Sequence, residues 1–115
     1  MDQQATAERI AQLLLRAKAI QLNTTAPFTW ASGIKSPIYC DNRIVLSYPK
    51  FRKKVWQALE EAARSYKGLD GIAGVATAGI PHAAAIAQSL DLPMVYVRSK
   101  AKGHGRQNLI EGEIT

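Results

Sequence analysis

Apolar residues recur with helical spacing near the start of the chain. Those that would share one face are Ile10, Leu13, Leu14 and Ala17, with charged and amide side chains on the opposite face. Apolar positions three and four residues apart are typical of an amphipathic helix that packs its stripe against a core. The pattern therefore predicts a helix over residues 5–18.

The following stretch, residues 19–47, has a different pattern. Short apolar or aromatic pieces at 20–22, 28–30 and 37–40 are separated by Asn, Gly, Ser and Pro, the residue types that form turns. We expect these pieces to be short strands. Residues 1–47 are thus predicted to form an N-terminal helix followed by a small, irregular hood.

A second amphipathic helix is predicted after the hood. Ser47 has the side chain of an N-cap residue, and Pro49 suits a first helical turn because that turn does not need its missing N–H. We expect the helix to end near Ser65, before Gly68. Its predicted buried stripe consists of Phe51, Val55, Ala58, Leu59 and Ala62.

The rest of the chain alternates strand and helix patterns. Apolar residues 71–76 and 93–97 flank a helical pattern over residues 81–90. Apolar strands joined by a helix form a βαβ unit with a parallel sheet whose strands are buried on both faces. Residues 48–98 are therefore expected to be a helix and a βαβ core of an α/β fold. Two core strands are few for such a fold, so we expect a domain that is incomplete at its C-terminus.

Composition and charge narrow the class of protein. The chain has 115 residues and is 47% hydrophobic, which fits one globular domain with a real core. Its net charge of +6 favours an anionic partner, which leaves nucleic acid, a membrane surface and phosphorylated small molecules open.

The cysteine count and the lengths of the apolar runs indicate in which cellular compartment the protein is expected. Cys40 is the single cysteine of the sequence, so no intramolecular disulfide can form. Arg16 and Lys18 follow the first apolar run, which therefore does not resemble a secretion signal. No run approaches the roughly 18 apolar residues that span a bilayer. We expect a cytoplasmic protein without a membrane partner.

A basic segment follows the last predicted strand. Residues 98–106 contain Arg98, Lys100, Lys102, His104 and Arg106, with two glycines and no acid. A segment without apolar periodicity is expected to be a solvated loop, and its cations suit phosphate oxygens. Such a segment could equally be ordinary solvated surface.

A turn of small residues lies between the first βαβ strand and its helix. Thr77, Ala78 and Gly79 would let a ligand approach the backbone, and the helix start presents free N–H groups suited to phosphate. Because ligands of open α/β sheets bind at the carboxyl ends of the strands, this turn and the basic segment should converge on one crevice. Close packing of strand and helix is the alternative reason for small residues here.

Four segments of the chain resemble the N-terminal half of the orotate phosphoribosyltransferase family. They are FTWASGIKSPIYCDNR at 28–43, GVATAGIPHA at 74–83, VRSKAKGHG at 97–105 and LIEG at 109–112. The resemblance implies a type I phosphoribosyltransferase fold with a central parallel sheet, and a homodimer. It also implies transfer of ribose 5-phosphate from phosphoribosyl pyrophosphate to orotate, with Mg²⁺ bound through the donor rather than by residues of the chain.

The resemblance also assigns roles to residues. Phe28, Lys35 and Tyr39 would belong to the hood over the orotate ring, with Tyr39 stacking on it. Thr77, Ala78 and Gly79 would hold the pyrophosphate. Residues 99–112 would form a flexible catalytic loop that closes over the site of the neighbouring subunit. Its Lys102 and His104 would act in catalysis, and Arg98, Lys100, Lys102 and His104 would contact the pyrophosphate. His82 is expected to be structural.

The chain departs from the family pattern in two respects. Ala31 and Ala78 stand where some members have lysine. The family's apolar strand that ends in two acids, and the following turn that binds the ribose and 5′-phosphate of the donor, do not occur in this sequence. We therefore expect the 115 residues alone to be inactive. Two other classes stay open: a module that binds nucleic acid or another anion, and a phosphoribosyltransferase for a purine base. The segment 98–106 has no aromatic residues among its cations, which argues against nucleic acid.

Overall fold

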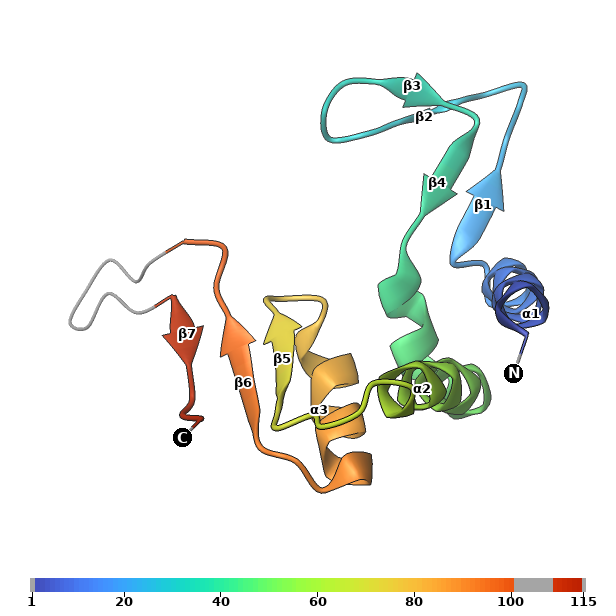
Figure 1. The fold of residues 1–115 in the computed structure, drawn as a ribbon. Helices are drawn as coiled ribbons and strands as arrows, with labels where there is room; N and C mark the ends of the chain where they lie inside the picture. Colours follow the sequence, from blue (N-terminus) through green and yellow to red (C-terminus); the bar gives the residue numbers. More distant parts are fainter. Residues whose placement is uncertain (1, 101–108, 115) are drawn as a thin grey trace. The chain divides into compact units, whose positions relative to one another are not determined.

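The computed structural model describes residues 2–100 and 109–114 (Figure 1). The chain forms two compact units, residues 1–55 and 56–115, so the boundary falls inside the second helix. The sequence indicated one domain. Two units result because the N-terminal helix builds a core of its own, whereas the βαβ segment packs around its sheet.

The first unit opens with α1 (Gln3–Arg16), which confirms the predicted N-terminal helix. The helix begins two residues earlier than predicted because the Asp2 side chain accepts a hydrogen bond from the Gln4 N–H at 2.9 Å and caps it. Leu13 and Ala17 of the predicted stripe are buried. The core of this unit combines Leu13, Ala17, Ala19 and Val45 with the half-buried Leu14, Ile44, Phe51 and Val55.

The hood consists of two antiparallel strand pairs. Strand β1 (Ile20–Leu22) pairs with β4 (Ile38–Cys40), and β2 (Phe28–Thr29) pairs with β3 (Lys35–Ser36). The hairpin between β2 and β3 closes because Gly33 has a φ of +89°, which glycine adopts without strain. Strands were expected at 20–22, 28–30 and 37–40, whereas β3 was not predicted.

A 3₁₀ helix, η1 (Asn42–Ser47), leads from the hood to α2 (Pro49–Arg64). Pro49 is the first residue of α2, as predicted for the first turn, but Ser47 belongs to η1 and does not cap α2. The predicted stripe is wrong for Leu59, which is 41% exposed, and for Ala62, which is also exposed. The reason is that Trp56 and Glu60, on another face of α2, make its contacts with the next helix.

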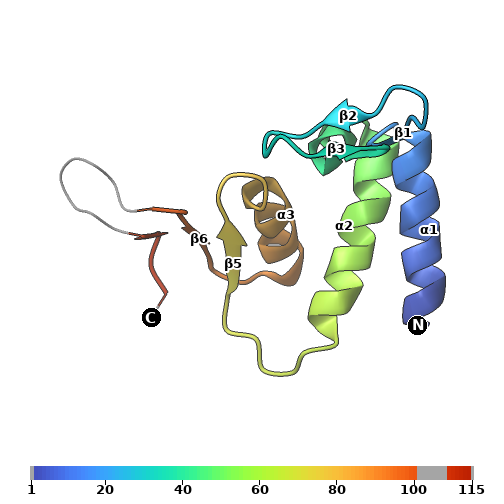
Figure 2. The same ribbon diagram turned by 90° about the horizontal axis from the view of Figure 1, so that it is seen from above.

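The second unit contains the predicted βαβ element. Parallel strands β5 (Ile72–Val75) and β6 (Met94–Val97) are connected by α3 (Ile80–Leu90), which packs on one face of both strands (Figure 2). A third strand, β7 (Ile110–Glu111), pairs antiparallel with β6, so the order is β5-β6-β7. The predicted loop over 99–112 is therefore too long at its C-terminal end.

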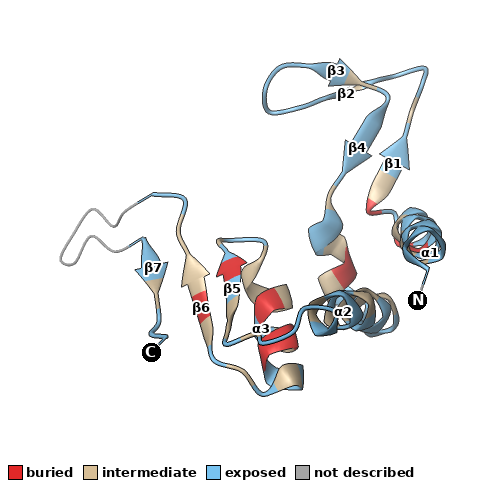
Figure 3. Cartoon of the chain, in the orientation of Figure 1, coloured by how far each residue is buried: buried red, intermediate tan, exposed pale blue. Residues whose placement is uncertain are grey.

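Burial within the sheet is one-sided. Gly74 is buried beneath α3, and the buried residues of this unit gather on α3 and the strands beside it (Figure 3). Val75, on the opposite face of β5, is 65% exposed. The expectation that both faces of the strands are buried is thus wrong for this chain, because α3 covers one face.

Candidate functional site

The turn between β5 and α3 is packed too closely for larger side chains. A Cβ added at Gly74 would lie 2.7 Å from the Ala83 Cβ, and one at Gly79 would lie 2.7 Å from the Val75 carbonyl oxygen. Both distances are shorter than any tolerated contact, so each position requires glycine. Close packing of strand and helix, the structural alternative for the small residues, therefore accounts for Gly74 and Gly79.

The same turn also offers backbone donors. In the part of the chain that the structure describes, the N–H groups of Thr77 and Ala78 have no acceptor, whereas the Gly79 N–H donates to the Val75 carbonyl at 2.8 Å. Helix α3 starts after Gly79 without a side-chain cap, and its first turn carries no acid. The unpaired N–H groups and the positive end of the helix dipole favour an anion at this place.

The turn lies beside the start of the basic segment. The Ala76 N–H donates to the Val97 carbonyl at 2.8 Å, and Val97 is followed directly by Arg98. The two elements therefore start side by side, and the crevice between them stays a prediction. Lys100 is described and exposed. The predicted catalytic residues Lys102 and His104 lie outside the described residues.

Arg98 has a partly buried position at the end of β6. Its backbone N–H donates to the Leu109 carbonyl at 2.7 Å, which continues the pairing of β6 with β7. Its side-chain Nε is buried and has no hydrogen-bond partner in the described ranges 2–100 and 109–114. A buried guanidinium N–H without an acceptor costs free energy, and an anionic ligand would supply the acceptor.

The hood brings two of its predicted ligand residues together. The rings of Phe28 on β2 and Tyr39 on β4 have centroids 5.7 Å apart and are inclined by 37°. The Trp30 indole N–H donates to the Ile38 carbonyl at 2.9 Å, which fixes the hairpin against β4. Lys35 is exposed on β3. These residues belong to the first unit, whereas the turn and Arg98 belong to the second.

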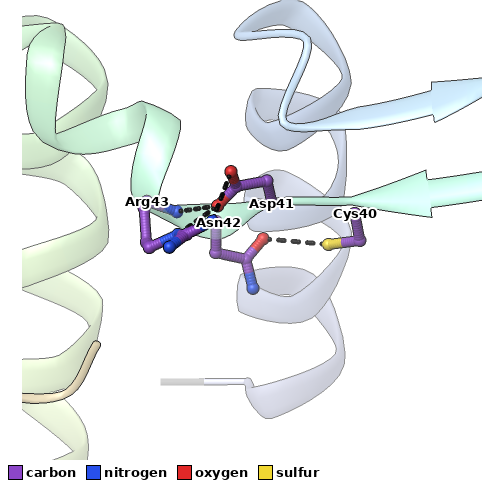
Figure 4. A network of polar contacts seen from close by, with 4 residues as sticks. All are labelled: Cys40, Asp41, Asn42 and Arg43. Carbon is purple, nitrogen blue, oxygen red and sulfur yellow. Dashed lines mark hydrogen bonds and ion pairs between the residues drawn. The ribbon is translucent and has the colours of Figure 1, made fainter. Parts of the chain in front are cut away.

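A polar network follows β4 that the sequence reasoning did not identify (Figure 4). The Asp41 carboxylate accepts hydrogen bonds from the backbone N–H and the guanidinium of Arg43, with Nε at 2.8 Å, and the Cys40 thiol donates to the Asn42 Oδ1 at 3.1 Å. The hydrogen bond from Arg43 lowers the pKa of Asp41, and the same bond raises the pKa of Arg43. The Asp-x-Arg spacing was the available signal for this capped start of η1.

Two negative findings concern metals and membranes. Residues 2–100 and 109–114 contain no group of three or more His, Cys, Asp or Glu that could hold a metal ion. Within the same ranges, no helix has the length and apolar character needed to cross a bilayer.

Comparisons with known proteins agree with this architecture. No protein-family model matches the chain. Over 94% of its length, the chain is 57% identical to orotate phosphoribosyltransferases of Listeria innocua and of Coxiella burnetii, and it covers 52% of each. The crystal structure of orotate phosphoribosyltransferase from Aeropyrum pernix is similar in fold, with a TM-score of 0.77 and 31% sequence identity. The match includes 92% of this chain and 59% of the Aeropyrum pernix chain.

The chain thus has the α/β fold of type I phosphoribosyltransferases, which confirms the predicted fold class. Within this class, the chain is similar to the N-terminal half of orotate phosphoribosyltransferase, as the four sequence segments indicated. The chain spans about half the length of the curated relatives it matches.

Proposed function

We propose that the protein transfers ribose 5-phosphate from phosphoribosyl pyrophosphate to orotate, giving orotidine 5′-monophosphate and pyrophosphate for pyrimidine biosynthesis. The observation that carries the proposal is the start of α3, which has no side-chain cap. There the Thr77 and Ala78 N–H groups have no acceptor among the described residues, and their turn starts beside the strand end that Arg98 follows. The identity of 57% to proteins named orotate phosphoribosyltransferase supports it.

The turn would hold the pyrophosphate group of the donor. The Thr77 and Ala78 N–H groups donate to its oxygens, and Gly79 allows the helix to begin close to the end of β5. These donors are fixed before the reaction, so they stabilise the charge that develops on the leaving group without further reorganisation. The pyrophosphate of the donor, rather than side chains of this chain, would hold Mg²⁺, which would offset part of the negative charge of the leaving group.

The basic segment would neutralise the departing pyrophosphate. The bond between the anomeric carbon and the pyrophosphate oxygen breaks, and the electron pair leaves with pyrophosphate. A ring nitrogen of orotate bonds to the carbon, and the proton of that nitrogen passes to the departing pyrophosphate or to water. Because the ribosyl centre becomes cationic in this step, catalysis needs placed cations and exclusion of water more than a nucleophile. Lys102 and His104 are the proposed catalytic residues, with Arg98 and Lys100 as further contacts.

The hood would hold the orotate ring. The Tyr39 ring is 37% exposed and lies against Phe28, so its free face can stack on a planar heterocycle while Phe28 supports the other side. Lys35, the first residue of β3, supplies positive charge for the carboxylate of orotate.

The remaining assignments stay proposals. We expect a homodimer in which residues 99–109 serve the site of the partner subunit, and a cytoplasmic location. The alternative of a purine base as acceptor is disfavoured by relatives of 54–57% identity that are named for orotate. An anion-binding module without activity would keep the turn but would not need the hood.

Formation of orotidine 5′-monophosphate tests the proposal. The assay uses a version of this chain extended to the length of the curated relatives, called here the full-length version, with orotate, donor and Mg²⁺. We expect turnover with orotate and none with adenine or hypoxanthine. Turnover with a purine base alone would assign the other branch, and pyrophosphate binding without any turnover would support the binding module.

A further inference from the structure

The first turn of α3 has no side-chain N-cap. Gly79 provides no capping side chain, so this turn is held by backbone hydrogen bonds, from the Ile80 N–H to the Thr77 carbonyl at 3.2 Å and from the Ala83 N–H to the Gly79 carbonyl at 3.0 Å. Glycine is tolerated as an N-cap, but it offers no side-chain acceptor to the free N–H groups, and helix ends are the first parts of a helix to fray. Anion binding by Thr77 and Ala78 nevertheless needs this turn in one conformation, since ordering it on binding would reduce affinity.

A contact from α2 reaches this same turn. The Trp56 indole N–H donates to Nδ1 of His82 at 2.8 Å, and the two rings meet edge to face with centroids 6.4 Å apart. Because Nδ1 accepts this bond, the ring proton of His82 lies on Nε2. Both side chains are half-buried, which limits competition from water. His82 is three residues after Gly79, so the bond fixes the turn that the missing cap would otherwise leave loose.

We propose that Trp56 and His82 are positioning residues for pyrophosphate: their hydrogen bond replaces the missing N-cap of α3 and holds the Thr77 and Ala78 N–H groups ready for the anion. The inference rests on the proposed function of the turn. It differs from the expectation that His82 is only structural, because it links the Trp56–His82 bond to the affinity for one ligand.

A second contact between the same helices provides a matched control. Glu60, one turn after Trp56 on α2, is hydrogen-bonded by Ser89 in the last turn of α3. Both contacts attach α3 to α2, but Ser89 lies at the end of the helix that is far from the pyrophosphate turn. A purely structural role predicts that loss of either contact has the same effect on ligand binding.

The test compares variants of the full-length version by calorimetric titration with inorganic pyrophosphate. Trp56→Phe removes the donor and keeps an aromatic ring, and His82→Leu removes the acceptor. We expect each to weaken pyrophosphate binding about threefold to tenfold, as loss of one net hydrogen bond implies. The double variant should be no weaker than either single one, because both changes remove the same bond. His82→Asn, whose Oδ1 takes the place of Nδ1, should restore most of the affinity.

Two further readouts separate positioning from general destabilisation. Ser89→Ala should leave pyrophosphate affinity unchanged even if its melting temperature falls as far as that of Trp56→Phe. In steady-state kinetics, Trp56→Phe should raise the KM for the donor and leave the KM for orotate unchanged. Backbone amide spectra should show the Thr77 and Ala78 signals shifting on titration in the unmodified protein.

The outcomes distinguish this inference from the proposed function. If the unmodified protein binds no pyrophosphate at the turn, both fail. If it binds pyrophosphate and Trp56→Phe binds equally well, or if the two single effects add in the double variant, the positioning role is overturned and the proposed function stands. Should His82→Leu fail to fold, Trp56→Phe and His82→Asn decide the question alone.

Discussion

Val75 and Val97 lie opposite each other in the parallel strands β5 and β6. The chain leaves both strands at the same end of the sheet, so the turn that begins at Ala76 and the basic segment that begins at Arg98 start side by side. The hydrogen bond from the Ala76 N–H to the Val97 carbonyl fixes this relationship at 2.8 Å. Two elements that we propose to bind anions, although they are separated along the sequence, therefore start at the same place because of the strand register.

Replacing the basic side chains should reduce turnover. Lys102→Ala and His104→Ala in the full-length version should each lower kcat roughly thirty- to a thousandfold, since one charge-assisted contact to a leaving group contributes on the order of 2–4 kcal/mol. The KM for orotate should change little. Steady-state kinetics with both substrates measures this, and Lys67→Ala, an exposed lysine outside both loops, is the control. A rise in orotate KM with kcat unchanged would contradict the assigned role.

Mixing variants should show whether the basic loop serves the partner subunit. Lys102→Ala has an intact hood, and Tyr39→Ala has an intact loop. The assay uses an orotate concentration well below KM, where homodimers of either variant have low activity. If the loop crosses the interface, a heterodimer of the two variants contains one site in which hood and loop are both unmodified. Random exchange makes half of the dimers heterodimers, and each has one functional site of two. Activity should therefore recover toward about one quarter of the unmodified level. An unchanged low activity after subunit exchange would indicate that each loop serves its own subunit.

The hood prediction separates ring stacking from the tyrosine hydroxyl. Tyr39→Ala should raise the KM for orotate roughly tenfold, because aromatic stacking on a base contributes about 1–3 kcal/mol. Tyr39→Phe keeps the ring and the contact with Phe28, and should behave nearly as the unmodified protein. Equal effects of both substitutions would assign the role to the hydroxyl instead.

Close packing between β5 and α3 should make Gly74 intolerant of a methyl group. Gly74→Ala places a Cβ 2.7 Å from the Ala83 Cβ, so we expect a loss of about 1–3 kcal/mol in the free energy of unfolding, measured by urea denaturation. Ala83→Gly removes the opposing Cβ at a cost of about 1 kcal/mol in helix propensity. The double variant should therefore lose less than the sum of the two single losses. Simple additivity would show that these two positions do not touch.

Stability should fall in acid partly through Glu60. Hydrogen bonding from Ser89, and then from Arg64, lowers its pKa below the ordinary value of 4.5. A carboxyl with a lowered folded-state pKa stabilises the fold fully above its unfolded pKa, and loses this contribution as the pH falls through the folded value. The stability difference between the unmodified protein and Glu60→Gln should thus be constant from pH 7 to about 5 and shrink below about 4.5. Urea denaturation at each pH measures this difference, and a difference that does not change with pH would contradict the contribution assigned to Glu60.

The sequence by itself determined the elements whose pattern is local. The stripe of α1 and the strand, helix and strand of residues 72–97 were predictable because apolar periodicity reflects the face that each element buries. The position of the turn at Thr77–Gly79 beside the start of the basic segment was also predictable, since parallel strands bring their carboxyl ends to one edge. The resemblance in four segments pointed to the same class of fold that the solved structures share.

Only the tertiary structure decided the features that depend on a distant partner. Strands β3 and β7 have two residues each, too few for a period, and they exist because β2 and β6 supply their hydrogen bonds. On α2, Phe51 and Val55 of the predicted stripe pack against the core, whereas later in the helix Trp56 and Glu60 make the contacts with α3. The bond between Trp56 and His82 joins residues 26 positions apart, and no local propensity encodes such a contact. It arises when α2 and α3 pack, because an indole N–H and an imidazole nitrogen that leave water must satisfy each other.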